Sequence, residues 1–150
     1  MSIPSAWPQM LDFFGTAIVV EPSPGQLSGD AGLLPIRQFD ERIGLTRSFA
    51  DALDDPRDPD LTEHSILEMA RSRTYGILAG YEDQDDHDTL RADPVFKLLA
   101  DRSPNDDHLA SQPTLSRFEN AISIPSLKRL RDVFLDRFIA LRRRACQWRR

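Results

Sequence analysis

Residues 75–120 read YGILAGYEDQDDHDTLRADPVFKLLADRSPNDDHLASQPTLSRFEN, and this stretch decides the fold. Gly80 suits the C-terminus of a helix because glycine reaches left-handed dihedral angles without a side-chain clash. Asp93-Pro94 starts the next helix, since aspartate caps free N–H groups and proline fits the first turn. Ser111-Gln112-Pro113 repeats that pattern. The stretch therefore predicts three helices joined by turns, the first turn being the acidic segment 82–88.

The flanking segments add helices and one strand. Apolar residues at helical spacing over 33–43 predict a helix that ends at Gly44, and residues 49–53 indicate one more short helix. Residues 16–21 predict a short strand, and the apolar stripe that follows Ser126 predicts a long amphipathic helix. We expect a mainly α fold with a short β region near the N-terminus. Its parts are a disordered leader (1–13), a helical domain (14–126) and a basic C-terminal helix (127–150).

One arginine falls on an apolar helix face. Asp60 and Glu63 have the spacing of a capping box, and an apolar face follows over residues 66–81. Arg73 lies on that same face, where a guanidinium group is costly unless a carboxylate meets it. The acidic turn offers such carboxylates, so we predict a structural ion pair of Arg73 with Asp83 and Asp86.

Composition and charge limit the class of protein. The chain has 150 residues, 40% hydrophobic and 29% charged, which is typical of a soluble domain. No apolar run has the length needed to span a bilayer, so we expect no membrane contact. Cys146 is the single cysteine, so an internal disulfide and a cysteine-based zinc site are excluded and a reducing cytoplasm is expected. Residues 127–150 hold nine Lys or Arg and two Asp, a charge of +7, whereas residues 1–126 carry −12. The basic end could fold back on the acidic body or meet an anion such as nucleic acid.

The acidic turn does not have the spacing of a metal site. An EF-hand loop needs glycine at its sixth position and a carboxylate at its twelfth, but counting from Asp83 those positions hold Asp88 and Pro94. The three histidines also lack a paired ligand spacing. We therefore predict a solvated turn and no metal ligand in this chain.

Residues 109–118 resemble the second half of a helix-turn-helix unit. In such a unit Leu115 and Phe118 face the core, while polar side chains reach phosphates or base edges. A short capped helix within a bundle is the alternative. The predicted DNA-binding residues, including two at the start of the basic helix, are Gln112, Thr114, Ser116, Arg117, Lys128 and Arg129.

Four motifs carry a family resemblance: SGDAGLLPIRQFDER (28–42), DPRDPDLTEH (55–64), GYEDQDDHDTLRADPVF (80–96) and LASQPTLSRFEN (109–120). They resemble the N-terminal region of bacterial insertion-sequence transposases of the DDE domain group 1 type. The resemblance covers about residues 14–141. It implies a metal-dependent DNA strand transferase, with a ribonuclease H-like core in which three acidic residues hold Mg²⁺ or Mn²⁺.

The sequence departs from that pattern after Leu141, where it reads RRRACQWRR. No acidic strand follows, so no catalytic residue is carried over. We expect an N-terminal fragment, ended by a frameshift or an early stop. It would bind insertion-sequence ends and could self-associate, without catalysing transposition itself. A stand-alone helix-turn-helix regulator is the alternative, and a hydrolase that uses the acidic turn is a third, weaker one.

Overall fold

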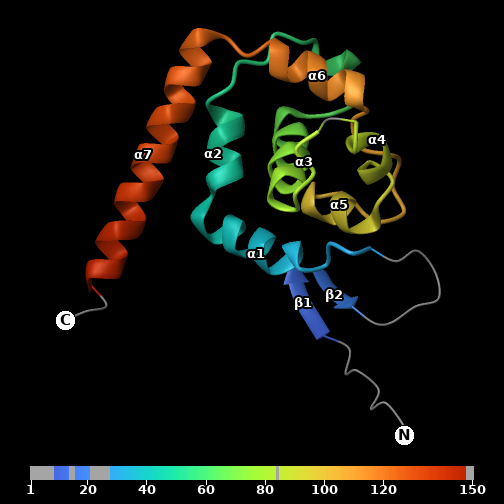
Figure 1. The fold of residues 1–150 in the computed structure, drawn as a ribbon, viewed down its shortest axis with the longest axis horizontal. Coiled ribbons are helices and arrows are strands. Elements are labelled where there is room, and N and C mark those ends of the chain that lie inside the picture. Colours follow the sequence, from blue (N-terminus) through green and yellow to red (C-terminus); the bar gives the residue numbers. More distant parts are fainter. Residues whose placement is uncertain (1–8, 14–15, 21–27, 84, 148–150) are drawn as a thin grey trace, which may run out of the picture.

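The computed structural model describes residues 9–13, 16–20, 28–83 and 85–147, and it is mainly helical, as predicted (Figure 1). Most helices are short and pack around α3, while α7 runs away from them alongside α2. The elements are β1 (Gln9–Phe13), β2 (Thr16–Val20), α1 (Leu33–Ile43), α2 (Leu45–Asp51), the 3₁₀ turn η1 (Pro59–Leu61), α3 (Ile66–Leu78), α4 (His87–Leu90), α5 (Pro94–Leu99), α6 (Gln112–Asn120) and α7 (Ile124–Gln147).

The two strands form an antiparallel hairpin ahead of the helices. Gln9 pairs with Val20 and Phe13 with Thr16. β1 falls in the stretch that the sequence analysis assigns to a leader, whose first eight residues lie outside the described residues. The helices that position the site begin after it.

Glycine divides α1 from α2, as predicted. Gly44 has φ 65°, and its N–H donates to the carbonyl of Asp40 at 2.6 Å. A residue with a Cβ adopts this left-handed geometry only at a cost. The bend lets α2 turn upward beside α3 instead of continuing α1.

The start of α3 lies later than the sequence pattern suggested. The predicted capping box at Asp60 and Glu63 is wrong, because residues 59–61 form a 3₁₀ turn. Ser65 is the N-cap instead, and its hydroxyl accepts from the backbone N–H of Glu68 at 3.1 Å. The end of α3 is as predicted, since Gly80 follows it with φ 93°.

α5 begins at the predicted Pro94, and α6 begins at Gln112 with the predicted Pro113 in its first turn. The Asp93 carboxylate accepts from the N–H groups of Val95 at 2.7 Å and Phe96 at 3.1 Å. Residues 100–111 then separate α5 from α6. A helix-turn-helix joins its helices by three or four residues. α6 is therefore not joined to α5 in that way, and the resemblance of residues 109–118 to the second half of such a unit stays a prediction.

Two apolar clusters form the core. The larger joins α1, α3 and α5 around fully buried Phe96 and Leu99, and the ring of Tyr81 meets Phe96 edge-on at 6.3 Å. The smaller lies between α3 and α6, where Met69 packs with Leu115. α6 is thus fixed to the body by its apolar side, which leaves its opposite side toward solvent.

Two buried arginines tie α1, α3 and the loop after α5 together. Arg37 donates to the Glu41 carboxylate at 2.6 Å, the Asp101 carboxylate at 2.7 Å and the Leu99 carbonyl at 3.1 Å. Arg71 donates to the other Asp101 oxygen and lies 3.5 Å from Glu41. Asp101 has φ 67°, an uncommon angle that aspartate tolerates better than most residues. It holds its carboxylate between both guanidinium groups.

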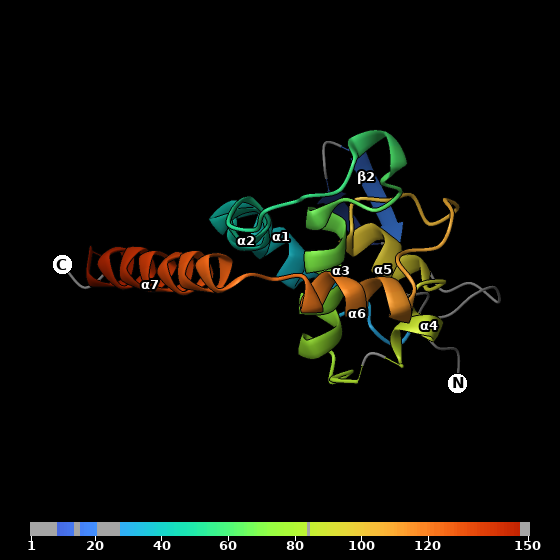
Figure 2. The same ribbon diagram turned by 90° about the horizontal axis from the view of Figure 1, so that it is seen from above.

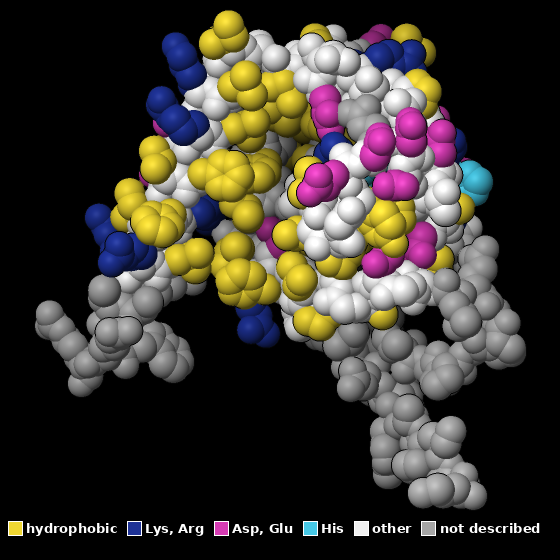
Figure 3. Space-filling view, in the orientation of Figure 1, with side chains coloured by type: hydrophobic (Ala, Val, Ile, Leu, Met, Phe, Trp, Pro, Cys, Tyr) yellow, Lys and Arg dark blue, Asp and Glu magenta, His cyan; other side chains and the backbone are white. Residues whose placement is uncertain are grey.

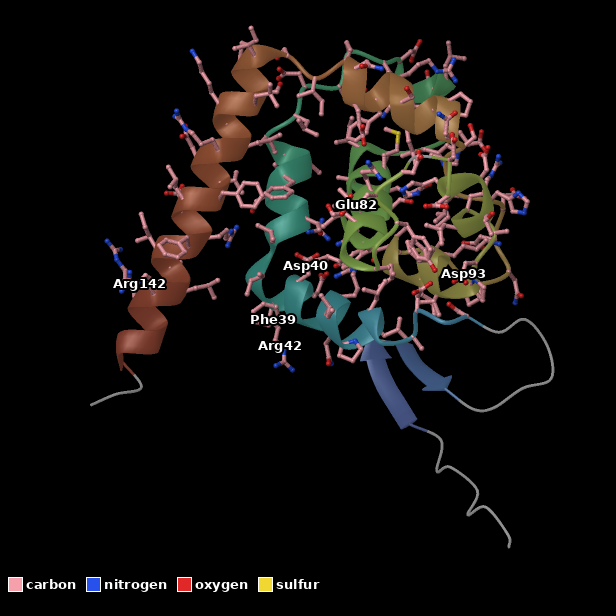
Figure 4. The ribbon with its side chains drawn as sticks, viewed as in Figure 1. Phe39, Asp40, Arg42, Glu82, Asp93 and Arg142 are labelled. Atoms are coloured by element: carbon pink, nitrogen blue, oxygen red, sulfur yellow. The ribbon has the colours of Figure 1, made fainter. Side chains whose placement is uncertain are left out.

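A third carboxylate extends this cluster toward α2. Asp40 accepts from the backbone N–H of Thr46 at 2.9 Å, from the Thr46 hydroxyl, and from the Tyr75 hydroxyl at 3.0 Å (Figure 4). Burial and the nearby Asp40 charge raise the pKa of Tyr75, so its hydroxyl stays a donor. The Arg71 Nε also donates to the Thr46 hydroxyl at 3.2 Å.

Candidate nucleic-acid interface

α6 carries four of the six predicted DNA-binding residues. Gln112, Thr114 and Ser116 are half-buried and Arg117 is exposed. The Thr114 hydroxyl lies 3.1 Å from that of Ser111, and the Ser116 hydroxyl accepts from Asn120 at 3.4 Å. Of these four predicted residues, Arg117 is therefore the one with an exposed side chain.

The N-terminus of α6 already faces a negative charge. A helix start favours anions because its N–H groups are free and its dipole is positive there. In this chain the backbone N–H of Gln112 donates to the Asp88 carboxylate at 3.2 Å. A DNA phosphate would have to displace that carboxylate, so this end of α6 is a poor phosphate site.

Arg117 folds back along its own helix. Its Nε donates to the Pro113 carbonyl at 3.1 Å, and Nη2 lies 3.5 Å from the Thr114 hydroxyl. Arg117 is exposed, so its side chain can exchange these contacts for water. Asp55, Asp58 and Glu63 line the same pocket as Arg117, together with one other arginine, Arg57. The excess of carboxylates opposes the approach of a phosphate.

The remaining two predicted residues, Lys128 and Arg129, differ in role. Arg129 joins α7 to the end of α2: its Nε donates to the Ala52 carbonyl at 2.8 Å and Nη2 to the Asp54 carboxylate at 2.6 Å. Hydrogen bonds from Arg129 and Ser126 lower the pKa of Asp54. Arg129 is thus occupied in docking the helix, whereas Lys128 is exposed.

The outer side of α7 presents a row of cations. Figure 3 shows Lys and Arg side chains along the edge of α7, while acidic side chains gather over the opposite end of the body. Figure 4 shows Arg142 pointing away from α1 and α2. Arg131 is exposed beside Asp132 at 2.7 Å. The exposed cations of this outer face are Lys128, Arg131, Arg142 and Arg143.

Arg73 is half-buried and meets a carboxylate, but not the predicted one. Its Nε donates to Glu119 of α6 at 2.5 Å. The acidic turn supplies a backbone group instead, because Nη2 donates to the Glu82 carbonyl at 2.8 Å. The expected pairing with Asp83 and Asp86 is corrected to Glu119, since α6 packs across α3 and brings that carboxylate to the guanidinium group.

His87 is buried next to the Arg73 guanidinium group. His87 is 1% exposed, and its Nε2 lies 3.5 Å from Nη1 of Arg73. Burial lowers the pKa of His87, and the charge of Arg73 lowers it further. A neutral imidazole with Nε2 as the acceptor therefore fits this position.

Replacing Arg73 by alanine should lower the free energy of unfolding by about 1–3 kcal/mol, because the half-buried Glu119 and the Glu82 carbonyl lose their donor. Chemical denaturation measures the change. The milder Glu119→Gln variant, which keeps an acceptor for the guanidinium group, should lose less. An Arg73→Ala protein as stable as wild type would show that the contact is not structural.

A family model described as transposase DDE domain group 1 matches residues 12–148. The chain belongs to this transposase family. No curated protein and no solved structure matches the chain. Membership relates the protein to DNA transposition, and the four sequence motifs that suggested the family all lie inside the matched region.

The transposase family is expected to use a divalent ion held by converging carboxylates. Among the described residues, no three His, Cys, Asp or Glu side chains are grouped so that they could hold a metal ion. The carboxylates that do converge, Glu41 and Asp101, accept hydrogen bonds from two guanidinium groups. These residues of the transposase chain therefore do not fit the ion.

Sequence reasoning missed the arginine cluster in this transposase. A signal was available: Arg37 and Glu41 are four residues apart, and Arg37 lies three residues after buried Leu34, on the same side of α1. Sequence spacing could not identify Asp101 as the shared carboxylate partner, since it lies 64 residues from Arg37. In the described parts of the chain, no helix has the length and apolar character needed to cross a bilayer.

Proposed function

We propose that this transposase chain binds DNA through the outer face of α7, defined by Lys128, Arg131, Arg142 and Arg143. The exposure of these cations on an otherwise acidic chain carries the proposal. The natural target is the end of an insertion sequence. Catalysis of strand transfer is not assigned to the described residues.

The shape of α7 supports this role. The helix has 24 residues, so it extends about 36 Å. Lys128, Arg131 and Arg142 lie within about 60° of one another around its axis, since each residue turns the helix by about 100°. A row of cations on one side of a straight helix can follow the phosphates along a groove edge.

Charge explains why α7, and not α6, is the main contact. Arg117 shares its pocket with more carboxylates than cations, since Asp55 pairs with Arg57 while Asp58 and Glu63 remain to repel a phosphate. The cations on α7 lie away from the acidic turn, as Figure 3 shows. α6 therefore contributes less to DNA affinity than the sequence alone suggested, and Arg129 supports binding by holding α7 on α2.

The Lys128→Ala/Arg142→Ala variant should bind labelled duplex DNA about tenfold more weakly than wild type, because two phosphate contacts are lost. Fluorescence anisotropy at fixed, moderate salt measures the affinity. The matched control is Arg42→Ala/Arg47→Ala, which removes two exposed arginines from α1 and α2. Its affinity should stay close to wild type.

The separate variant Arg117→Ala tests the contribution of α6. We expect it to lose less DNA affinity than the Lys128→Ala/Arg142→Ala variant. Equal affinities of the α7 variant and wild type would remove α7 as the DNA contact. If the control variant loses as much DNA affinity as the α7 variant, the binding is a general charge attraction and the outer face of α7 is not the contact.

A further inference from the structure

An apolar pocket of about 550 Å³ lies between the linker before α3, the start of α3 and α6. Its apolar lining comes from Leu61, Ile66 and Met69 on one side and from Phe118 and Ile122 on the other. Leu61 is 85% exposed at the mouth. A lining of this kind at a protein surface is typical of a groove that receives side chains of a partner.

Carboxylates border the same pocket. Asp55, Asp58 and Glu63 all lie on its linker side. A hydrogen bond from Arg57 lowers the pKa of Asp55, which stays ionised at neutral pH. Two cations, Arg57 and Arg117, line the pocket as well, and Arg57 pairs with Asp55 at 2.7 Å. Asp58 and Glu63 are the carboxylates that a docked segment with apolar anchors and positive charge would meet.

α7 has that combination. Phe134, Phe138 and Leu141 are 57%, 58% and 41% exposed and are spaced i, i+4 and i+7. This is the anchor spacing by which an amphipathic helix enters an apolar groove. Arg142 and Arg143 follow directly, and the Arg142 guanidinium group lies 5.9 Å from the Phe138 ring centre. Figure 3 shows hydrophobic side chains along α7. The ring of Phe134 packs on Phe49 of α2 at 4.7 Å, which leaves Phe138 and Leu141 as the anchors.

The helix cannot fill the groove of its own chain. Ser126, near the beginning of α7, lines the pocket, and the helix then runs away from it. Leu141 lies 15 residues further on, about 22 Å along the axis. Figures 1 and 2 both show the end of α7 far from α6. The occupant must come from another molecule.

We infer that the second half of α7 from one copy of the chain docks in the pocket of a second copy. Phe138 and Leu141 fill the apolar groove, while Arg142 and Arg143 meet the carboxylates at its border. If each copy supplies its helix to the other, the contact closes as a two-fold dimer. Arg142 and Arg143 belong to both proposals, because the Arg142 guanidinium group lies over the Phe138 ring. The two proposals are therefore tested apart at Phe138 and Leu61, which are not part of the DNA contact.

Direct pairing of two α7 helices through their apolar stripes fits less well. Arg131 and Arg142 flank one side of the stripe and Arg137 flanks the other. An α7 pair would bring these cations of both copies together, at a cost in repulsion. Docking in the acidic groove instead places unlike charges side by side.

Sedimentation velocity of the whole chain over a concentration series tests the inference. Phe138→Glu removes an apolar anchor from α7, and Leu61→Asp places a charge in the groove. Both positions are exposed, so the variants should still fold. Each variant alone should self-associate at least about tenfold more weakly than wild type. The control Ile77→Glu, at an exposed apolar position on α3, should associate like wild type.

An experiment that mixes the two variants distinguishes groove docking from pairing of two α7 helices. In an equal mixture of the two variants, the intact helix of Leu61→Asp can dock in the intact groove of Phe138→Glu, so a mixed dimer should form. Association that survives Leu61→Asp would overturn groove docking in favour of α7 pairing. A monomeric wild type across the series, or no mixed dimer, would also overturn it.

Discussion

Replacing Arg71 by methionine is expected to lower the free energy of unfolding by about 3 kcal/mol. Arg71 is 1% exposed and meets the Asp101 carboxylate, Glu41 and the Thr46 hydroxyl. Breaking a buried pair from one side costs about 3–5 kcal/mol, because the remaining charge loses its partner. The lower end applies because the Asp101 side chain is one-third exposed and keeps Arg37.

Thermal unfolding measures this change, and the melting temperature should fall by roughly 6–12 °C. The control Arg47→Met, at an exposed site on α2, should change the stability by less than about 0.5 kcal/mol. Arg71→Lys should lose most of the same stability, since one ammonium group cannot span three acceptors. Equal melting temperatures for Arg71→Met and Arg47→Met would contradict a stabilising role for the arginine cluster.

Replacing Gly76 by alanine should destabilise the protein by about 1–2 kcal/mol, although alanine normally favours a helix. A Cβ at this position would lie 2.9 Å from both Cε1 and Nε2 of His87. Crowding a packed core costs about 1–3 kcal/mol, whereas the gain in helix propensity is at most about 1 kcal/mol. His87 cannot move away without leaving Arg73.

A double-mutant cycle checks the cause. In a His87→Ala background the ring is gone, so Gly76→Ala should no longer destabilise the fold. Gly32→Ala is the control, because nothing lies within 4 Å of its Cβ and its φ of −61° suits alanine. A Gly76→Ala loss that persists without the His87 ring would mean that crowding by the imidazole is not its source.

The elements were predictable where a residue has one local role. Gly44 and Gly80 end helices because of their own dihedral angles, and Asp93-Pro94 starts one because of its own side chains. These signals act over three or four residues, so the sequence displays them directly. The mainly α fold follows from them together with the apolar spacing.

The buried side of α3 was not predictable in the same way. Its apolar residues suggested a face that includes Ile77 and Leu78, yet both are exposed. The buried side carries Glu68, Arg71 and Ser72 beside the apolar Met69 and Ala70. Periodicity counts apolar residues, and it fails where buried charges are paired with partners far along the chain.

The candidate interface shows the same limit. The sequence pattern of α7 separated its cations from its apolar stripe. It could not show that Arg129 has a partner on the body of the protein and that Lys128 differs from it in this respect. The partner that occupies Arg129 is Asp54, which lies 75 residues away. Only the packing of α7 on α2 shows that Arg129 is held by partners on the body of the protein.

The salt dependence of DNA binding tests the central claim most directly. The logarithm of the association constant should fall linearly with the logarithm of salt concentration, since each phosphate contact releases counterions. Removing Lys128 and Arg142 together should reduce the magnitude of that slope by about 1.8, while Arg42→Ala/Arg47→Ala leaves it unchanged. Identical slopes for wild type and the α7 variant, or no DNA binding by wild type at low salt, would contradict the account.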